Sequence, residues 1–122
     1  KNGKKPFVVL MRDCVIGDSW ETCVAKSEPT MTTHRWYYHY GAYVQDDHIK
    51  DIKSPEELTF DVAAKQRLIA GSPDQCLEQL QMWKEEVKPD YVMLRMRQPG
   101  GPPQSEALAD IKMFGDRVIK YL

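Results

Sequence analysis

Three arginines and two adjacent glycines are the residues whose types and positions suit the binding of a charged ligand. Arg12 follows an apolar run near the N-terminus, and Arg95 and Arg97 lie toward the end of a second apolar run. Guanidinium groups hold phosphate, sulfonate or carboxylate groups through paired hydrogen bonds. Gly100 and Gly101 follow closely, and a glycine loop can bring backbone donors near a ligand. These five residues are therefore the candidate binding residues.

Each candidate also has a purely structural interpretation, which the sequence leaves open. Buried arginines usually pair with carboxylates, and Gly100-Gly101 has the composition of an ordinary turn. No residue can be assigned a catalytic role. A metal site is not expected, because His48 and its neighbouring aspartates lack the converging ligands and defined spacing that metal sites need. The three cysteines form no CxxC pair, which favours free, buried thiols (Cys14, Cys23 and Cys76).

Two apolar runs must position the arginines. Phe7–Met11 ends at Arg12 and Asp13, and a turn follows at Gly17; the second run is Tyr91–Met96. Short continuous apolar runs are typical of strands buried on both faces of a parallel sheet. We therefore expect two buried strands, with Arg12 at the end of the first. In the second run Tyr91, Met93, Arg95 and Arg97 alternate onto one face, since side chains on a strand repeat every second residue.

Helices are expected between and after these strands. Asp18 is a suitable N-cap with Glu21 three residues later, and Pro29 should interrupt that helix before it resumes over 32–44. In this second stretch three aromatic residues share one helical face, either as a packing surface or as a pocket wall (Trp36, Tyr40 and Tyr43). Residues 45–53 read as a polar loop. A short helix with a capping box should start at Ser54.

The strongest local signal is the segment from Leu68 to Pro73. A short apolar strand ends at Gly71, Ser72 can cap a helix, Pro73 suits its first position, and Gln75 completes a capping box. The expected helix buries a stripe at helical spacing (Cys76, Leu80, Trp83 and Val87). A last helix from about Ser105 shows a second stripe (Leu108, Ile111, Phe114 and Val118).

Strands alternate with helices along the chain, which indicates an α/β fold with a parallel sheet. Only two of the strands are strong, and so small a parallel sheet cannot cover its own edges. The 122 residues are also about half of the roughly 250 that a complete (β/α)8 barrel requires. The sequence therefore reads as part of a larger structure.

Several segments resemble the bacterial-luciferase-like flavin monooxygenases. LIAGSPDQCLEQLQMWKEE is similar to the Gly-Ser-Pro element and helix near the C-terminus of that family, and DYVMLRM follows at the distance of the last barrel strand. VVLMRDCVIGDSWETC looks like a late strand and the start of its helix, although Thr22 stands where the family commonly has alanine. FGDRVI resembles the family's terminal helix. The likeness covers nearly the whole chain but rests on pattern and order.

The resemblance implies a partial (β/α)8 TIM-type barrel, consisting of the last βα units only, with residues 1–122 as the C-terminal part of the domain. It implies reduced FMN as cofactor, bound mainly by residues outside this chain, and oxidation of a small organic substrate by dioxygen. The arginine and glycine candidates would then bind flavin or substrate. The fragment alone is expected to be inactive. Two alternatives stay open: a deazaflavin-dependent oxidoreductase of the same superfamily, and a non-catalytic small α/β interaction domain.

Composition narrows the possible partners. The formal net charge is -1, so no basic excess points to nucleic acid or to an anionic membrane. No apolar run approaches the roughly 20 residues that span a bilayer. We expect a cytoplasmic protein. We also expect it to form homo-oligomers, because the incomplete sheet should recruit partners.

Overall fold

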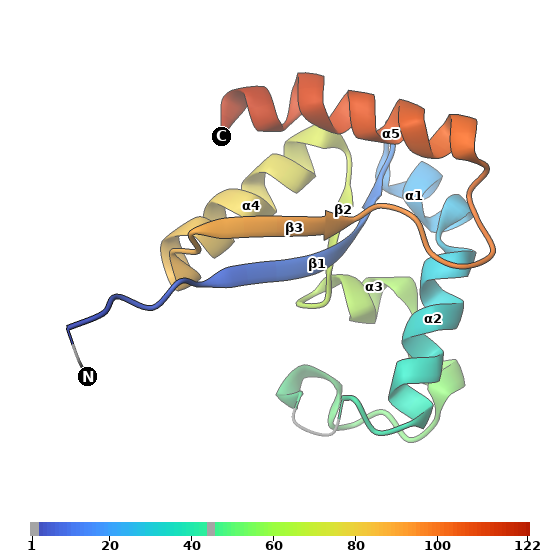
Figure 1. Cartoon of the computed structure of the whole chain (residues 1–122). Coiled ribbons are helices and arrows are strands. Elements are labelled where there is room, and N and C mark those ends of the chain that lie inside the picture. The colour runs from blue at the N-terminus through green and yellow to red at the C-terminus, as the bar shows by residue number, and fades with distance from the viewer. Residues whose placement is uncertain (1–2, 44–45) are drawn as a thin grey trace.

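The computed structural model describes residues 3–43 and 46–122, in which three strands form a sheet with helices on both faces (Figure 1). In chain order, the helices and strands are β1 (Val9–Ile16), α1 (Trp20–Lys26), α2 (Glu28–His39), α3 (Phe60–Ala64), β2 (Leu68–Gly71), α4 (Pro73–Val87), β3 (Tyr91–Arg95) and α5 (Gln104–Arg117). Short 3₁₀ turns cover Asp47–Ile49, Pro55–Glu57 and Ile119–Tyr121. The expected α/β class is confirmed.

All strand pairs in this sheet are parallel, and the strand order is β2-β1-β3. The central strand β1 places Asp13 opposite Leu68 of β2 on one side and opposite Arg95 of β3 on the other. In a (β/α)8 barrel each strand instead pairs with the next along the chain. The arrangement of this sheet therefore differs from three consecutive barrel strands, because β3 pairs with β1 and not with β2.

Two hydrophobic clusters lie on opposite faces of the sheet. On one face α4 and α5 pack over β1 and β2 through Cys14, Ile69, Leu80 and Phe114. On the other face α1, α2 and α3 contribute a second cluster, which includes Cys23, Met31, Leu58, Phe60 and Ala63 around Val15, Leu68 and Ala70 of the sheet. The sheet is thus the middle layer of three (Figure 1).

The β2–α4 unit forms as the sequence predicts. Ser72 accepts a hydrogen bond from the Gln75 backbone, the Gln75 side chain accepts one from the Ser72 backbone, and Pro73 occupies the first turn of α4. Gly71 has a φ of +121°, and a Cβ there would lie 2.3 Å from the Gln75 side chain. Glycine is therefore required where β2 turns into α4. Along the predicted stripe of α4, Cys76 and Leu80 are buried but Val87 is exposed.

The two predicted strands are less buried than their apolar sequences suggest. β1 does not end at Arg12 and Asp13 but continues to Ile16, and its most buried residues lie in this second half. Phe7 precedes the strand and is exposed, as are Val9 and Met11. β3 is an edge strand with four exposed residues of five. Burial of both strands on both faces was thus a wrong prediction, because no helix of residues 3–43 and 46–122 covers one face of their N-terminal parts.

The helices that follow β1 also begin and end elsewhere than expected. Ser19, and not Asp18, caps α1. Pro29 does not interrupt a helix but lies in the first turn of α2, where its missing N–H costs nothing. Helix α2 ends at His39, so Tyr40 and Tyr43 lie beyond it. Trp36 and Tyr40 are exposed whereas Tyr43 is buried, and the three aromatic residues therefore do not share one face. Val44 and Gln45, where the predicted helix and loop meet, lie outside the described residues.

Two smaller expectations need correction as well. Ser54 makes no capping hydrogen bond, and the segment after it is a 3₁₀ turn followed by α3, which Thr59 caps. In α5 the predicted stripe is only half right, since Phe114 and Val118 are buried but Leu108 and Ile111 are exposed. Among the residues described, no helix is long and apolar enough to cross a membrane.

Candidate functional site

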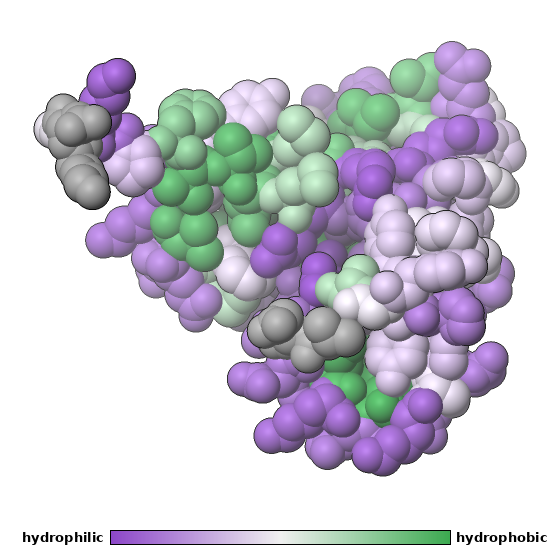
Figure 2. All heavy atoms as spheres, turned by 60° about the horizontal axis from the view of Figure 1, so that its bottom comes forward, coloured by the Kyte–Doolittle hydropathy of each residue, from purple (hydrophilic) through white to green (hydrophobic). Residues whose placement is uncertain are grey.

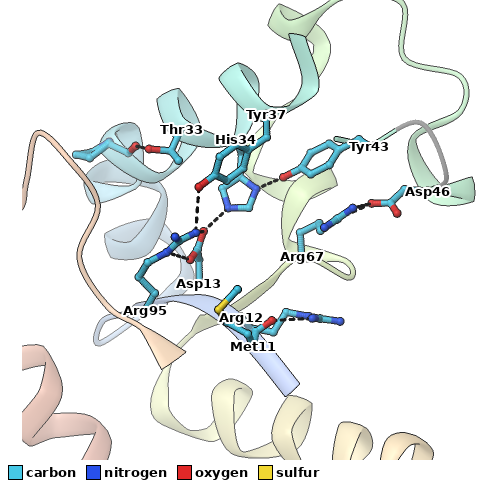
Figure 3. A network of polar contacts seen from close by, with 11 residues as sticks. Met11, Arg12, Asp13, Thr33, His34, Tyr37, Tyr43, Asp46, Arg67 and Arg95 are labelled. Atoms are coloured by element: carbon cyan, nitrogen blue, oxygen red, sulfur yellow. Dashed lines mark hydrogen bonds and ion pairs between the residues drawn. The ribbon is translucent and has the colours of Figure 1, made fainter. Parts of the chain in front are cut away.

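A cavity of about 260 Å³ opens on the face of the sheet that α2 partly covers. It lies beside the middle of β1, the last residue of β3 and the residue that precedes β2 (Figure 3). Charged and aromatic side chains dominate its lining. The lining residues are Met11, Arg12, Asp13, His34, Tyr37, Ala42, Tyr43, Arg67 and Arg95.

Asp13 is the centre of the polar contacts in this cavity. Its carboxylate accepts hydrogen bonds from Arg95 Nε at 2.6 Å and Arg95 NH2 at 3.1 Å, and it lies 2.6 Å from His34 Nε2. Burial alone would raise the pKa of Asp13, but the hydrogen bonds from His34 and Arg95 outweigh it and lower this pKa. The same contact with Asp13 raises the pKa of Arg95. Asp13 is therefore an ionised carboxylate held by two partners.

Strand and helix periodicity explain how these side chains meet. Asp13 and Arg95 are neighbours in the parallel register, and their side chains lie on the face toward α2. Thr30, Met31 and His34 are the buried residues of α2, spaced as one helical face. Met31 joins the hydrophobic cluster and His34, one turn later, reaches Asp13. Packing of α2 against the sheet thus carries the histidine to the carboxylate.

His34 connects Asp13 to a buried tyrosine. Its second ring nitrogen, Nδ1, is hydrogen-bonded to the hydroxyl of Tyr43, so both ring nitrogens have partners. Burial raises the pKa of Tyr43, which keeps its phenol protonated. Tyr37 packs edge-on against the His34 ring and accepts a hydrogen bond from Arg95 at 3.3 Å. The three side chains Asp13, His34 and Tyr43 form a continuous hydrogen-bonded chain along the cavity (Figure 3).

Two further arginines complete the lining. The Arg67 guanidinium stacks on the Tyr43 ring, 4.2 Å from its centroid, and is paired with Asp46. The Arg12 guanidinium lies 4.6 Å from the Trp83 ring and donates to the Met11 carbonyl, while its Nε is buried without a partner. Burial and the nearby charge of Arg67 lower the pKa of Arg12. These like charges make the cavity attractive to an anion.

The structure brings together two of the five residues predicted from the sequence. Arg12 and Arg95 both line the cavity, although Arg12 lies in the middle of β1 and not at its end. Arg97 points elsewhere, because its Nε donates to the Pro102 carbonyl at 2.7 Å. Gly100 and Gly101 adopt positive φ values of 93° and 142° in this same loop, apart from the cavity lining. These three residues therefore shape a turn.

Sequence reasoning missed four polar residues of the cavity, namely Asp13, His34, Tyr37 and Arg67, whereas Tyr43 had been considered as part of an aromatic packing surface or pocket wall. The useful signal was the charge of Asp13 within a strand that continues into Cys14, Val15 and Ile16, because a carboxylate there needs a buried partner. Nothing in the local pattern identified that partner, since His34 is 21 residues away in sequence. Nothing in the sequence distinguished Arg67, because charged residues are common immediately before a strand such as β2.

The other groups considered for chemistry remain outside this cavity. Cys14, Cys23 and Cys76 are free and buried, as expected. Burial raises the pKa of Cys23 to about 11, so its thiol is a poor nucleophile. Within residues 3–43 and 46–122, no group of three or more potential ligands is placed to hold a metal ion. The ring nitrogens of His48 have no hydrogen-bond partner there.

Comparison with known proteins adds no relative. The sequence matches no protein family model and no curated protein. The cavity and its hydrogen-bonded chain are therefore interpreted from their own geometry.

Proposed function

We propose that this chain is the C-terminal part of a flavin-dependent monooxygenase of the bacterial-luciferase-like class. The whole protein would use reduced FMN and dioxygen to oxidise a small organic substrate. One observation carries the proposal: an arginine-lined cavity lies on a sheet face that exposes apolar residues at its other end (Val9, Met11, Tyr91 and Met93). An apolar face of parallel strands needs a cover, and the interior side chains of a closed barrel would supply one.

The order of the chain also supports the proposal. Each strand is followed by helices, and the β2–α4 junction matches the segment that carries the family resemblance. Units of a strand followed by a helix are the repeating element of the (β/α)8 barrel. The sequence pattern and the local structure thus agree for this unit.

The proposal must explain two features: helices α1, α2 and α3 cover part of the face that a barrel would turn inward, and the strand order differs from that of a barrel. In a barrel the second edge of β1 belongs to an upstream strand, and β3 pairs with β2. Here β3 occupies that edge of β1. An unpaired parallel edge leaves backbone donors and acceptors without partners, so β3 satisfies them when no other strand is present. We propose that upstream strands displace β3 to the free edge of β2.

Spin labels at Met11 and Met93, which are register partners here, test this displacement. The labels should be within about 10 Å in the 122-residue chain, since adjacent strands lie about 5 Å apart. In the longer protein β2 would lie between β1 and β3, so the distance between the two labels should increase. An equally short distance in the longer protein contradicts the barrel.

The cavity fits only part of the proposed cofactor. Its volume of about 260 Å³ is below the roughly 300–1,000 Å³ of typical small-molecule sites. A phosphate or another acidic group fits among the arginines, whereas the ring system would need residues outside this chain. Bound reduced flavin supplies the reaction with dioxygen. The residues of this chain would bind and orient the anionic group and hold protons at His34 and Tyr43.

Oxygen consumption tests the activity. The 122-residue chain with reduced FMN should show no turnover above the spontaneous oxidation of the flavin, whereas the longer protein with its substrate should consume oxygen. Reduction of a deazaflavin without oxygen uptake by the longer protein would instead establish the related oxidoreductase. If the longer protein binds neither cofactor, the proposed function is wrong.

A non-catalytic interaction domain is the second candidate function. The exposed apolar residues of β1 and β3 favour it, because monomeric proteins rarely expose contiguous apolar patches of this kind. This candidate predicts a stable complex with a partner and no flavin binding by the longer protein. Flavin titration therefore separates it from the first proposal.

A further inference from the structure

The hydrogen-bonded side chains of Asp13, His34 and Tyr43 can share their protons in two different arrangements. The three residues are 5%, 4% and 4% exposed, and all three line the cavity. Each ring nitrogen of His34 has one partner, a carboxylate on one side and a phenol on the other. The hydrogen-bond directions along this chain therefore depend on the protonation of a single ring.

The first arrangement has neutral His34. The ionised Asp13 accepts a hydrogen bond, so the ring proton lies on Nε2 and Nδ1 is an acceptor. Tyr43 must then donate its hydroxyl hydrogen to Nδ1. In this arrangement the phenol has no hydrogen left for a ligand in the cavity.

The second arrangement has protonated His34. Both ring nitrogens now donate, Nε2 to Asp13 and Nδ1 to the Tyr43 oxygen. The hydroxyl hydrogen of Tyr43 is released from His34 and can turn toward the cavity. Protonation of the ring thus converts Tyr43 into a donor for an anionic ligand.

A bound anion should favour this second arrangement. The groups that face the ring or share its cavity are Asp13 and Arg12 from β1, Arg95 from β3, Tyr37 and Tyr43 from α2 and the turn after it, and Arg67 before β2, which is paired with Asp46. The three guanidinium groups exceed the two carboxylates by one positive charge, so an additional positive charge on the ring is unfavourable. A bound anion removes that penalty, so anion binding and proton uptake assist each other.

We propose that this cavity binds a small oxyanion group together with one proton, which His34 takes up. This inference rests on the proposed function, because it names the class of ligand that the same cavity binds. The oxyanion could be the phosphate of FMN or an acidic group of the substrate. The proton comes from solvent and resides on Nδ1 of His34, and no covalent bond changes.

Sulfate is a suitable probe because its charge is constant over the range of about pH 5 to 8 in which histidines change charge. Sulfate should bind the 122-residue chain about tenfold more tightly near pH 6 than near pH 8, which is a typical coupling between two sites. Calorimetry in two buffers of different ionisation enthalpy should show uptake of up to one proton per sulfate. Binding without proton uptake, or no binding, would overturn the proposal.

Matched variants locate the proton. His34→Gln cannot be protonated and should bind sulfate weakly at every pH, whereas His39→Gln should behave as the unsubstituted chain does. His39 is a matched control because it lies on the same helix but is exposed. If His34→Gln folds and retains the full pH dependence, His34 is not the proton acceptor. The proton count in the unsubstituted chain remains decisive if this variant does not fold.

Competition identifies the source of the oxyanion and separates this inference from the proposed function. Displacement of sulfate by FMN but not by riboflavin would assign the cavity to the flavin phosphate. Displacement by neither would exclude the flavin phosphate as the occupant of this cavity. Because the sulfate titration needs no flavin, it can succeed when the flavin tests fail, or fail when they succeed.

Discussion

The two halves of one sheet face differ sharply in how they are covered. In the carboxyl half, at the C-terminal ends of the strands, Asp13 and His34 are buried, and the Asp13 carboxylate is paired with His34 and with the more exposed Arg95. In the amino half, Val9 and Met11 are 48% and 54% exposed, and Tyr91 and Met93 beside them are similarly exposed. Figure 2 shows hydrophobic surface toward the left of this side of the molecule.

The contrast reverses the usual distribution of residues, because a carboxylate and a histidine are buried in one half and the apolar residues of the other half face solvent. Burial of charges is favourable only when each has a well-placed partner, and α2 supplies one through His34. No helix among the described residues covers the apolar half. The face therefore combines a paired polar site with an uncovered apolar surface.

Removal of the carboxylate should break this contrast most strongly. Asp13→Ala leaves His34 and Arg95 without their shared partner, and loss of one member of a buried ion pair costs about 3–5 kcal/mol. Urea unfolding measures the change. Asp116→Ala, which removes an exposed i,i+4 partner of Lys112, should leave the unfolding curve unchanged. Equal effects of the two substitutions would show that the network at Asp13 does not stabilise the fold.

Acid should weaken the same half of the face by a smaller, graded amount. The pKa of Asp13 is lowered in the folded chain, because the hydrogen bonds from His34 and Arg95 exceed the opposing effect of burial. A depressed pKa stabilises the fold above the unfolded value of about 3.9. This contribution is lost as the pH falls from there through the folded pKa. Unfolding free energies measured from about pH 6 downward should show this slope, and the slope should be smaller in Asp13→Asn.

Charge introduced in the amino half should have the smallest effect on stability. Met93→Lys places a charge on an exposed face, so the free energy of unfolding should change by no more than about 0.5 kcal/mol. Hydrophobic-dye binding and self-association should both decrease, because the apolar patch is interrupted. Dye fluorescence and light scattering measure these effects. Leu94→Lys is the matched control, since Leu94 packs against the α4–α5 cluster on the opposite face and its substitution should destabilise the chain.

A monomeric unsubstituted chain that binds no dye would contradict the expected self-association. It would mean that the exposed apolar residues of β1 and β3 remain in contact with water without binding another copy of the chain. A large loss of stability in Met93→Lys, equal to that of Leu94→Lys, would mean that this half packs against something within the chain.

The local sequence was sufficient for the elements whose signals are local. The strand, glycine turn, capping box and helix from Leu68 to Val87 form as predicted, because each requirement is met by residues within a few positions of one another. The α/β class and the parallel sheet followed from the alternation of strands and helices. The alternation of Leu94 and Arg95 onto opposite faces of β3 was also correct, since it depends only on the geometry of a strand.

Only the tertiary structure decided which face of each strand is covered and which charges meet. The run from Phe7 to Met11 has the composition of a core strand, yet Phe7, Val9 and Met11 are exposed because α2 lies over the other end of β1. The partnership of Asp13 with His34 and Arg95 joins residues 21 and 82 positions apart in sequence. No local pattern encodes such a meeting, because burial and charge pairing depend on where separate elements pack.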